Sequence, residues 1–136
     1  MMKVTIIAPE GLKEKYLREA ADEYIKRLRG FCDLRIAEFS PFKLPEKPSA
    51  AQIAATLDRE AEQILKKIPE GSRTAALCIE GKMLSSEELA AEIRAADNSG
   101  TPFTFIIGSS HGLAEQVKKN ADIRLSFSKM TFPHQL

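Results

Sequence analysis

The sequence predicts an α/β domain with a mostly parallel five-stranded sheet flanked by helices, and two observations support this fold class. First, short runs rich in β-branched and aromatic residues alternate with longer segments whose apolar residues recur every three or four positions. Second, the run from Arg73 to Ile79 is almost continuous in small and apolar residues, which is typical of a strand covered on both faces. Strands that alternate with helices form parallel sheets through right-handed crossovers.

Five segments are expected to be strands: Lys3–Ala8, Asp33–Phe39, Arg73–Ile79, Phe103–Ile107 and Ile123–Phe127. The run Phe-Thr-Phe-Ile-Ile at 103–107 is the strongest of these patterns, because it combines aromatic and β-branched residues. Three prolines between Ser40 and Ser49 exclude both a ladder and a helix there, so this segment is expected to be a loop. The residues from Ser128 to Leu136 are also expected to form a loop.

Four segments are expected to be helices: residues 12–29, a helix that starts near Ser49 and runs to 68, a helix between 85 and 100, and a short one at 113–120. In the first of these, spacings of four, three and four place Leu17, Ala21, Tyr24 and Leu28 on one helical face. Ser85 followed by Glu88 has the spacing of a capping box, which indicates where the third helix begins.

Composition narrows the function classes. A chain of 136 residues with 43% hydrophobic and 29% charged residues fits one domain over residues 1–136. Cys32 and Cys78 form no metal-ligand pattern and are expected to be small buried hydrophobes, so no metal is expected. No apolar run approaches the roughly 18 residues of a membrane span, and the N-terminus lacks a signal-peptide core. We therefore expect a cytoplasmic protein without a membrane partner.

The net charge of +1 does not by itself indicate a nucleic-acid binder, so any RNA contact must come from a local basic face. Basic residues are frequent in the first predicted helix, but acidic residues interleave with them. A solvated face with salt bridges and a surface that contacts the RNA backbone are both compatible with this pattern.

Three segments follow parallel strands and are expected to meet at one edge of the sheet, where open α/β sheets bind their ligands. They cover Leu77–Lys82, Ile107–Leu113 and Ser126–Gln135. Gly108 allows close backbone approach by a ligand, and Gly112 opens a short helix with free amide groups. A tight turn without a ligand and a nucleotide- or phosphate-binding turn are the two interpretations of that segment, which matches neither G-x-G-x-x-G nor a Walker A motif.

The third segment carries Phe127, Met130 and Phe132 among small polar residues. These side chains are expected to pack into the core or to form an apolar wall for a flat adenine ring, and the two are compatible because a pocket wall can also be part of the core. His111 and His134 are the only histidines, and neither lies in a Ser or Cys nucleophile pattern. Glu80 has no visible carboxylate partner, so the sequence supports no triad, paired-carboxylate or metal chemistry.

The third segment identifies a family. Leu125 to Gln135, Leu-Ser-Phe-Ser-Lys-Met-Thr-Phe-Pro-His-Gln, closely resembles the signature loop of the RlmH family of SPOUT-class methyltransferases. Glu80 to Ser86 resembles the same family, as do Ile107-Gly108 and Gly112-Leu113, all in the family's order. Leu12 to Tyr16 and the helix that follows are also similar, so the resemblance runs over essentially the whole chain.

The resemblance implies a SPOUT fold, in which a trefoil knot near the C-terminus forms the cofactor pocket. It implies a homodimer that methylates N3 of a pseudouridine in 23S ribosomal RNA on the assembled ribosome. S-adenosyl-L-methionine would be the methyl donor. By matching motif positions, the cofactor contacts would fall on Leu77, Gly108, Phe127, Ser128, Lys129, Met130, Thr131 and Phe132.

The sequence departs from the family in two places. Ser109 stands where members commonly have a second glycine. Members also continue past the position of Leu136 with a helix that threads the knot and a basic tail. We therefore expect a chain that ends at Leu136 to lack the threading helix and to be weakly active or inactive. The catalytic base is not identified, and His134 is a candidate by position.

Two other functions are compatible with the residues. Gly108 and Gly112 also fit a flavodoxin-like module that binds a nucleotide or a phosphate without methyltransferase activity. A ribosome-binding protein without catalysis is the third possibility, suggested by the missing helix.

Overall fold

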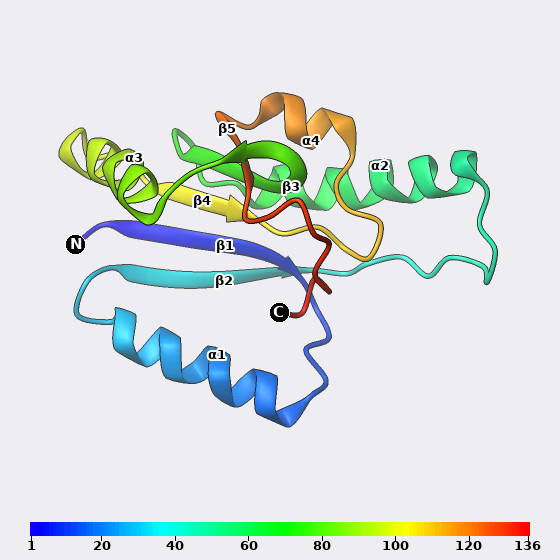
Figure 1. The fold of residues 1–136 in the computed structure, drawn as a ribbon, viewed down its shortest axis with the longest axis horizontal. Coiled ribbons are helices and arrows are strands. Elements are labelled where there is room, and N and C mark those ends of the chain that lie inside the picture. Colours follow the sequence, from blue (N-terminus) through cyan, green and yellow to red (C-terminus); the bar gives the residue numbers. More distant parts are fainter.

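The computed structural model describes residues 1–136 and shows a five-stranded, entirely parallel sheet flanked by four helices (Figure 1). The strands are β1 (Lys3–Pro9), β2 (Asp33–Phe39), β3 (Arg73–Met83), β4 (Phe103–Ile106) and β5 (Ile123–Ser126). The helices are α1 (Lys15–Leu28), α2 (Ala50–Lys67), α3 (Ser86–Asn98) and α4 (Glu115–Asn120). The spatial order is β2-β1-β4-β3-β5. The predicted fold class is confirmed, and the trefoil knot stays a prediction.

Helices cover the two faces of the sheet with separate apolar clusters. On one face, Ile64 of α2 and Val117 of α4 pack with buried residues of β1, β2, β3 and β4. On the other face, Ala96 of α3 packs against Ala75 and Phe103. Because β3 and β4 are covered on both faces, their sequences are almost entirely small and apolar in the paired region.

Helix α1 forms where it is predicted, but its apolar face is left largely uncovered, since none of its residues is buried. Leu17 is half-buried, Ala21 is exposed, and Tyr24 and Leu28 expose 62% and 38% of their surface. In Figure 1, α1 lies beside β2, the edge strand of the sheet. No further strand lies beyond β2, so the apolar stripe of α1 has too little sheet beneath it to be buried.

Strand β3 is longer than its sequence predicts and continues through Glu80, Gly81 and Lys82 to Met83. Leu125 of β5 pairs with both Leu77 and Lys82, so the residues between these two form an irregularity in the ladder. Irregularities of this kind bend a strand and redirect its side chains, and they often lie beside functional sites.

Side-chain caps fix the starts of two helices. Ser85 Oγ accepts a hydrogen bond from Glu88 N at 3.0 Å, and Glu88 Oε1 accepts one from Ser85 N at 2.9 Å. The predicted capping box is thus confirmed. A second box, of Ser49 with Gln52, starts α2 directly after the proline loop of residues 40–49. The start of this helix near Ser49 agrees with the prediction.

Replacing Ser85 with alanine should lower the free energy of unfolding by about 1 kcal/mol, because an amide at the start of α3 loses its acceptor. Urea denaturation followed by circular dichroism measures this change. Ser86→Ala, one residue further on, is the matched control and should change stability by less than half as much. Equal effects of the two substitutions would contradict the capping role.

Candidate functional site

The three segments singled out from the sequence meet at one cavity of about 930 Å³ at the carboxyl edge of the sheet. We call it the edge pocket; it is lined by residues 77–80, 107–113, 118, 125–128 and 130–136. The segments converge because β4, β3 and β5 are parallel neighbours whose carboxyl ends point the same way. In Figure 1 the segment after β5, drawn in red, runs across the ends of these strands. The volume lies within the roughly 300–1,000 Å³ typical of small-molecule sites.

The wall after β4 is a tight turn held by its own backbone. Gly112 N donates to Ser109 O at 2.9 Å, and Gly112 has a φ of +87°, which favours glycine. Gly108 is buried against the backbone of Gly112, where a Cβ atom would overlap carbonyl atoms. The turn itself therefore requires both glycines. They let the backbone of residue 108 pack against the backbone of residue 112, and this requirement exists whether or not a ligand binds.

The wall from β3 is held equally closely to β5. A Cβ atom at Gly81 would lie 2.7 Å from the carbonyl carbon and oxygen of Arg124. Leu77, which comes just before the irregularity in β3, lines the pocket together with the three residues that follow it. The irregularity thus presents residues 77–80 to the pocket while the ladder to β5 continues beyond them.

The third wall is the segment after β5, and its apolar side chains are exposed. Phe127, Met130 and Phe132 expose 71%, 70% and 55% of their surface and all line the edge pocket. The interpretation of these residues as core is therefore wrong, because no element lies outside them to bury them. Ser128 holds the turn: its carbonyl accepts from Ser126 Oγ at 2.9 Å, and its hydroxyl accepts from Met130 N at 3.0 Å.

Most of the residues predicted to contact a cofactor come together in this pocket. Those lining it are Leu77, Gly108, Phe127, Ser128, Met130, Thr131 and Phe132, whereas Lys129 is exposed and does not line it. His134 also lines the pocket and is half-buried, while His111 is exposed at its rim. That these residues bind a cofactor stays a prediction.

Sequence analysis missed one charged element of the pocket, the ion pair of Lys118 with Glu80. Lys118 Nζ also lies 3.9 Å from Glu115, and only 16% of its side chain is exposed. The hydrogen bond from Lys118 lowers the pKa of the Glu80 carboxyl below its ordinary value. The two residues are 38 positions apart, so no sequence spacing could have indicated the pair.

The cysteines and the other possible metal ligands do not form a reactive group. Cys78 lines the pocket and Cys32 lies elsewhere; both are half-buried rather than buried as expected. Burial, with the nearby Glu80 carboxylate, raises the pKa of the Cys78 thiol, which disfavours a reactive thiolate. No three His, Cys, Asp or Glu side chains lie together as a metal site. None of the helices has the length and apolar character needed to cross a membrane.

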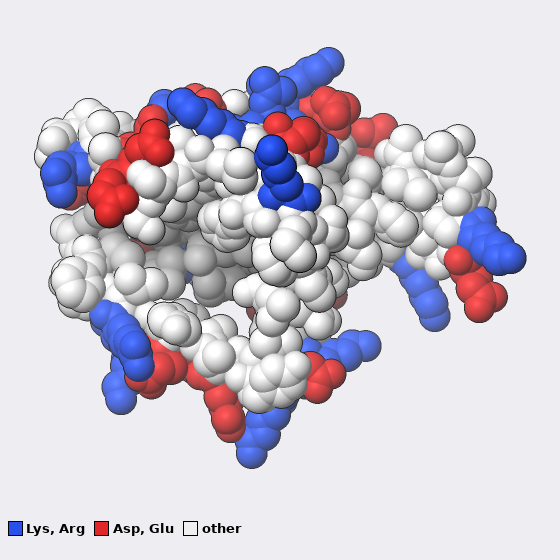
Figure 2. All heavy atoms as spheres, viewed as in Figure 1, with Lys and Arg blue, Asp and Glu red and all other residues white.

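Charge is distributed around this side of the molecule rather than concentrated on it. Figure 2 shows Lys and Arg interleaved with Asp and Glu around the periphery, while the centre of the view is uncharged. The walls of the edge pocket are accordingly apolar and small polar groups, with Lys118 and Glu80 as a neutralised pair. Such a pocket suits a ligand that is held by apolar contact and backbone hydrogen bonds.

A family model described as "Predicted SPOUT methyltransferase" matches residues 2–136. This chain belongs to the SPOUT methyltransferase family. It is therefore an enzyme of methyl transfer, and the resemblance noted from residues 80–86, 107–113 and 125–135 is confirmed. The edge pocket lies where those three segments meet.

Two curated relatives are both named "Ribosomal RNA large subunit methyltransferase H". The relative from Alkaliphilus oremlandii is 49% identical over 136 residues, and the one from Lactococcus lactis subsp. cremoris is 41% identical over 136 residues. In both cases the match covers 99% of this chain and 86% of the relative.

Gly108→Ala should destabilise the protein by about 1–3 kcal/mol, because the added methyl group overlaps the backbone of Gly112 and neither part can move freely. Gly30→Ala is the matched control: a Cβ there meets no atom within 4 Å, so stability should not fall. Thermal unfolding of both variants measures the difference. A Gly108→Ala protein as stable as the Gly30→Ala protein would contradict the close packing of this turn.

Lys118→Met should raise the pKa of Glu80 towards its ordinary value, because the hydrogen bond that favours the carboxylate is lost. A lowered pKa means that Glu80 stabilises the fold above its unfolded pKa and loses this contribution as the pH falls through its folded pKa. NMR titration of the Glu80 side-chain carboxyl measures the change. Lys119→Met, an exposed neighbour without an ion pair, should leave the titration unaltered, and an equal shift in both variants would refute the assignment.

Proposed function

We propose that residues 1–136 act as one SPOUT-type domain that methylates N3 of a pseudouridine in 23S ribosomal RNA, with S-adenosyl-L-methionine as methyl donor. The observation that carries this proposal is the convergence of the three family-matching segments on a single pocket of adequate volume. The names of the two relatives support a ribosomal RNA substrate. Such a substrate would be met in the cytoplasm, on the assembled ribosome.

The residues of the edge pocket fit an adenosine-containing sulfonium compound. Phe127, Met130 and Phe132 offer apolar surface to a flat ring, and the turn from Gly108 to Gly112 adds backbone groups of the kind that read a base edge. Leu77, Ser128 and Thr131 would complete the contacts. Lys129 is included from the match to the family motif alone, because its side chain is exposed and does not line the pocket.

When bound, S-adenosyl-L-methionine supplies an activated methyl group for an in-line displacement. The protein's part is to orient the acceptor base, exclude water and take up a proton from N3. Orientation alone can contribute several kcal/mol, on the order of the effects measured for well-aligned reactants. His134 is the proposed proton acceptor, because it lines the pocket and is half-buried. The pocket contains no other histidine apart from the exposed His111.

The proposal includes RNA contacts from a few exposed lysines rather than from a basic face. Lys82, Lys119 and Lys129 are exposed and flank the segments that form the pocket. Each phosphate that such a side chain neutralises makes binding weaker as salt increases. A small number of contacts agrees with the net charge of +1 and with the mixed charges in Figure 2.

A homodimer is part of the proposal, and the exposed apolar residues around α1 support it. Tyr16, Tyr24, Phe31 and Ile36 expose between 41% and 79% of their surface. They belong to α1, the turn after it and the edge strand β2. Grouped apolar residues on a surface commonly mark an interface with another protein. The trefoil knot is likewise proposed, from family membership.

Calorimetric binding and a transfer assay test the function together. S-adenosylhomocysteine should bind the protein at least about tenfold more tightly than a mononucleotide such as AMP, because AMP would bring a dianionic phosphate into a pocket whose lysine, Lys118, is already paired with Glu80, whereas the homocysteine group has no net charge. Radiolabelled methyl from S-adenosyl-L-methionine should then appear in 23S RNA of ribosomes, at a low rate because residues 1–136 alone are expected to be weakly active, and a reverse-transcriptase stop should map it. Ribosomes with uridine at the target position are the matched control, and the Alkaliphilus relative is the positive control for the assay.

The outcomes separate the competing functions. Tighter binding of the mononucleotide would favour the flavodoxin-like module that Gly108 and Gly112 also fit. Sedimentation with ribosomes but no incorporated methyl would favour a ribosome-binding protein without catalysis. Absence of S-adenosylhomocysteine binding would overturn the proposed function.

A further inference from the structure

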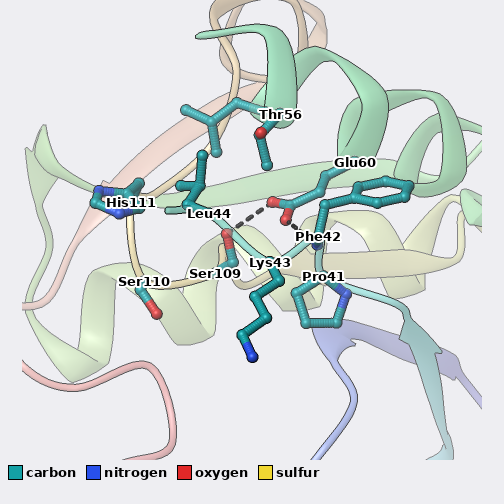
Figure 3. A pocket seen from close by; sticks show the side chains of 10 residues that line it. Pro41, Phe42, Lys43, Leu44, Thr56, Glu60, Ser109, Ser110 and His111 are labelled. Carbon is teal, nitrogen blue, oxygen red and sulfur yellow. Dashed lines mark hydrogen bonds between the residues drawn. The ribbon is translucent and has the colours of Figure 1, made fainter. Parts of the chain in front are cut away.

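Helix α2 contains a buried carboxylate that lies outside the three segments that form the edge pocket. Glu60 exposes only 2% of its surface and lies next to the buried Ala61. Figure 3 shows its side chain between Phe42 and Ser109, two residues that come from different loops. The structure has no ion pair for Glu60. A buried carboxylate without a cation must be held by hydrogen bonds, because its desolvation is otherwise strongly unfavourable.

Both carboxylate oxygens have such a partner. Oε2 accepts a hydrogen bond from Phe42 N at 3.0 Å, and Oε1 accepts one from Ser109 Oγ at 2.7 Å. The first bond fixes the proline loop of residues 40–49, and the second fixes the turn after β4. Glu60 thus joins two loops that lie far apart in the sequence.

The two loops depend on Glu60 to different degrees. The proline loop has further ties to α2, since Ser40 exchanges two hydrogen bonds with Gln63 and the Arg59 guanidinium lies 4.0 Å from the ring centre of Phe42. The turn from Gly108 to Gly112 has only one side-chain hydrogen bond to the rest of the protein, from Ser109 to Glu60. Loss of that bond should therefore free the turn but leave the proline loop in place.

The same turn is a wall of two cavities. Ser109, Ser110 and His111 line the edge pocket and also a smaller cavity of about 340 Å³ beside Glu60 (Figure 3). Any movement of the turn away from Glu60 would change the shape of the edge pocket directly. The position of this wall is thus set by a residue that does not itself line the edge pocket.

We propose that Glu60 is a positioning residue for methyl transfer, which acts through Ser109 to hold the Gly108–Gly112 turn in the shape that binds the methyl donor. The proposal rests on the proposed function of the edge pocket. It assigns Glu60 no contact with the cofactor or the RNA. Its effect is on the affinity and orientation of the donor, because the wall it holds belongs to the donor's pocket.

Three variants separate the tether from general stability. Ser109→Ala removes only the bond to the turn, and Glu60→Leu removes both bonds. Glu60→Gln is the conservative variant: its amide oxygen can still accept from Phe42 N, and its amide nitrogen can donate to Ser109 Oγ, since a hydroxyl is both donor and acceptor. Glu62→Leu on the exposed side of α2 is the matched control for loss of a carboxylate.

The tether is measured first without ligand, by hydrogen–deuterium exchange of the amides of residues 108–113. Exchange should become faster in Ser109→Ala and Glu60→Leu, remain slow in Glu60→Gln, and be unaltered in Glu62→Leu. If Glu60→Leu does not fold, Ser109→Ala alone carries this measurement. Unchanged exchange in Ser109→Ala would overturn the proposal whatever the pocket binds.

The consequence for the donor is measured next. Ser109→Ala should raise the Kd of S-adenosylhomocysteine and the KM of S-adenosyl-L-methionine about fivefold, as expected for one lost hydrogen bond, with little change in the KM of the RNA. Glu60→Gln should keep both constants near their wild-type values. The double variant Glu60→Leu/Ser109→Ala should bind the donor no more weakly than Glu60→Leu does. Faster exchange with unaltered donor affinity would overturn the positioning role. Failure of the wild-type protein to bind S-adenosylhomocysteine would instead overturn the proposed function, while the exchange data would still decide the tether.

Discussion

The pairing of β3 with both β4 and β5 is the constraint on which the site depends. These strands are parallel, so three consecutive connections of the chain must leave the sheet at the same edge. Close backbone contacts then lock the edge: Gly81 lies against Arg124, and Gly108 lies against Gly112. The pocket exists because of these contacts between backbones, and the side chains that line it are arranged on a frame that tolerates no added carbon atom at either glycine.

Sequence reasoning succeeded where the signal is local. The strand limits, the proline loop and the cap at Ser85 all follow from neighbouring residues, and the structure agrees within a few positions. The carboxyl-edge location of the three segments also followed, because parallel topology and strand ends determine it. The family assignment rested on motif likeness rather than on chemistry, since no acid–base pair or nucleophile was visible in the pattern.

The errors came from long-range information that periodicity does not contain. The stripe on α1 is real in the sequence, but its burial depends on what lies beyond the edge strand β2. Phe127 and Met130 looked like core because they are large and apolar, yet nothing covers them. The role of Glu60 has no signal in the sequence, since only the fold brings Ser109 to it, 49 positions later in the chain.

The order of strands also has a consequence for how the chain folds during synthesis. β1 pairs with β2 across about thirty residues, Val4 with Leu34, but with β4 across about a hundred, Val4 with Phe103. Both neighbours of β3 follow it in the chain, so β3 has no partner until β4 has been made. The half of the sheet that carries the pocket therefore assembles last. Until the ribosome has released β5, the strand edges in this half of the sheet remain open to pairing with other chains.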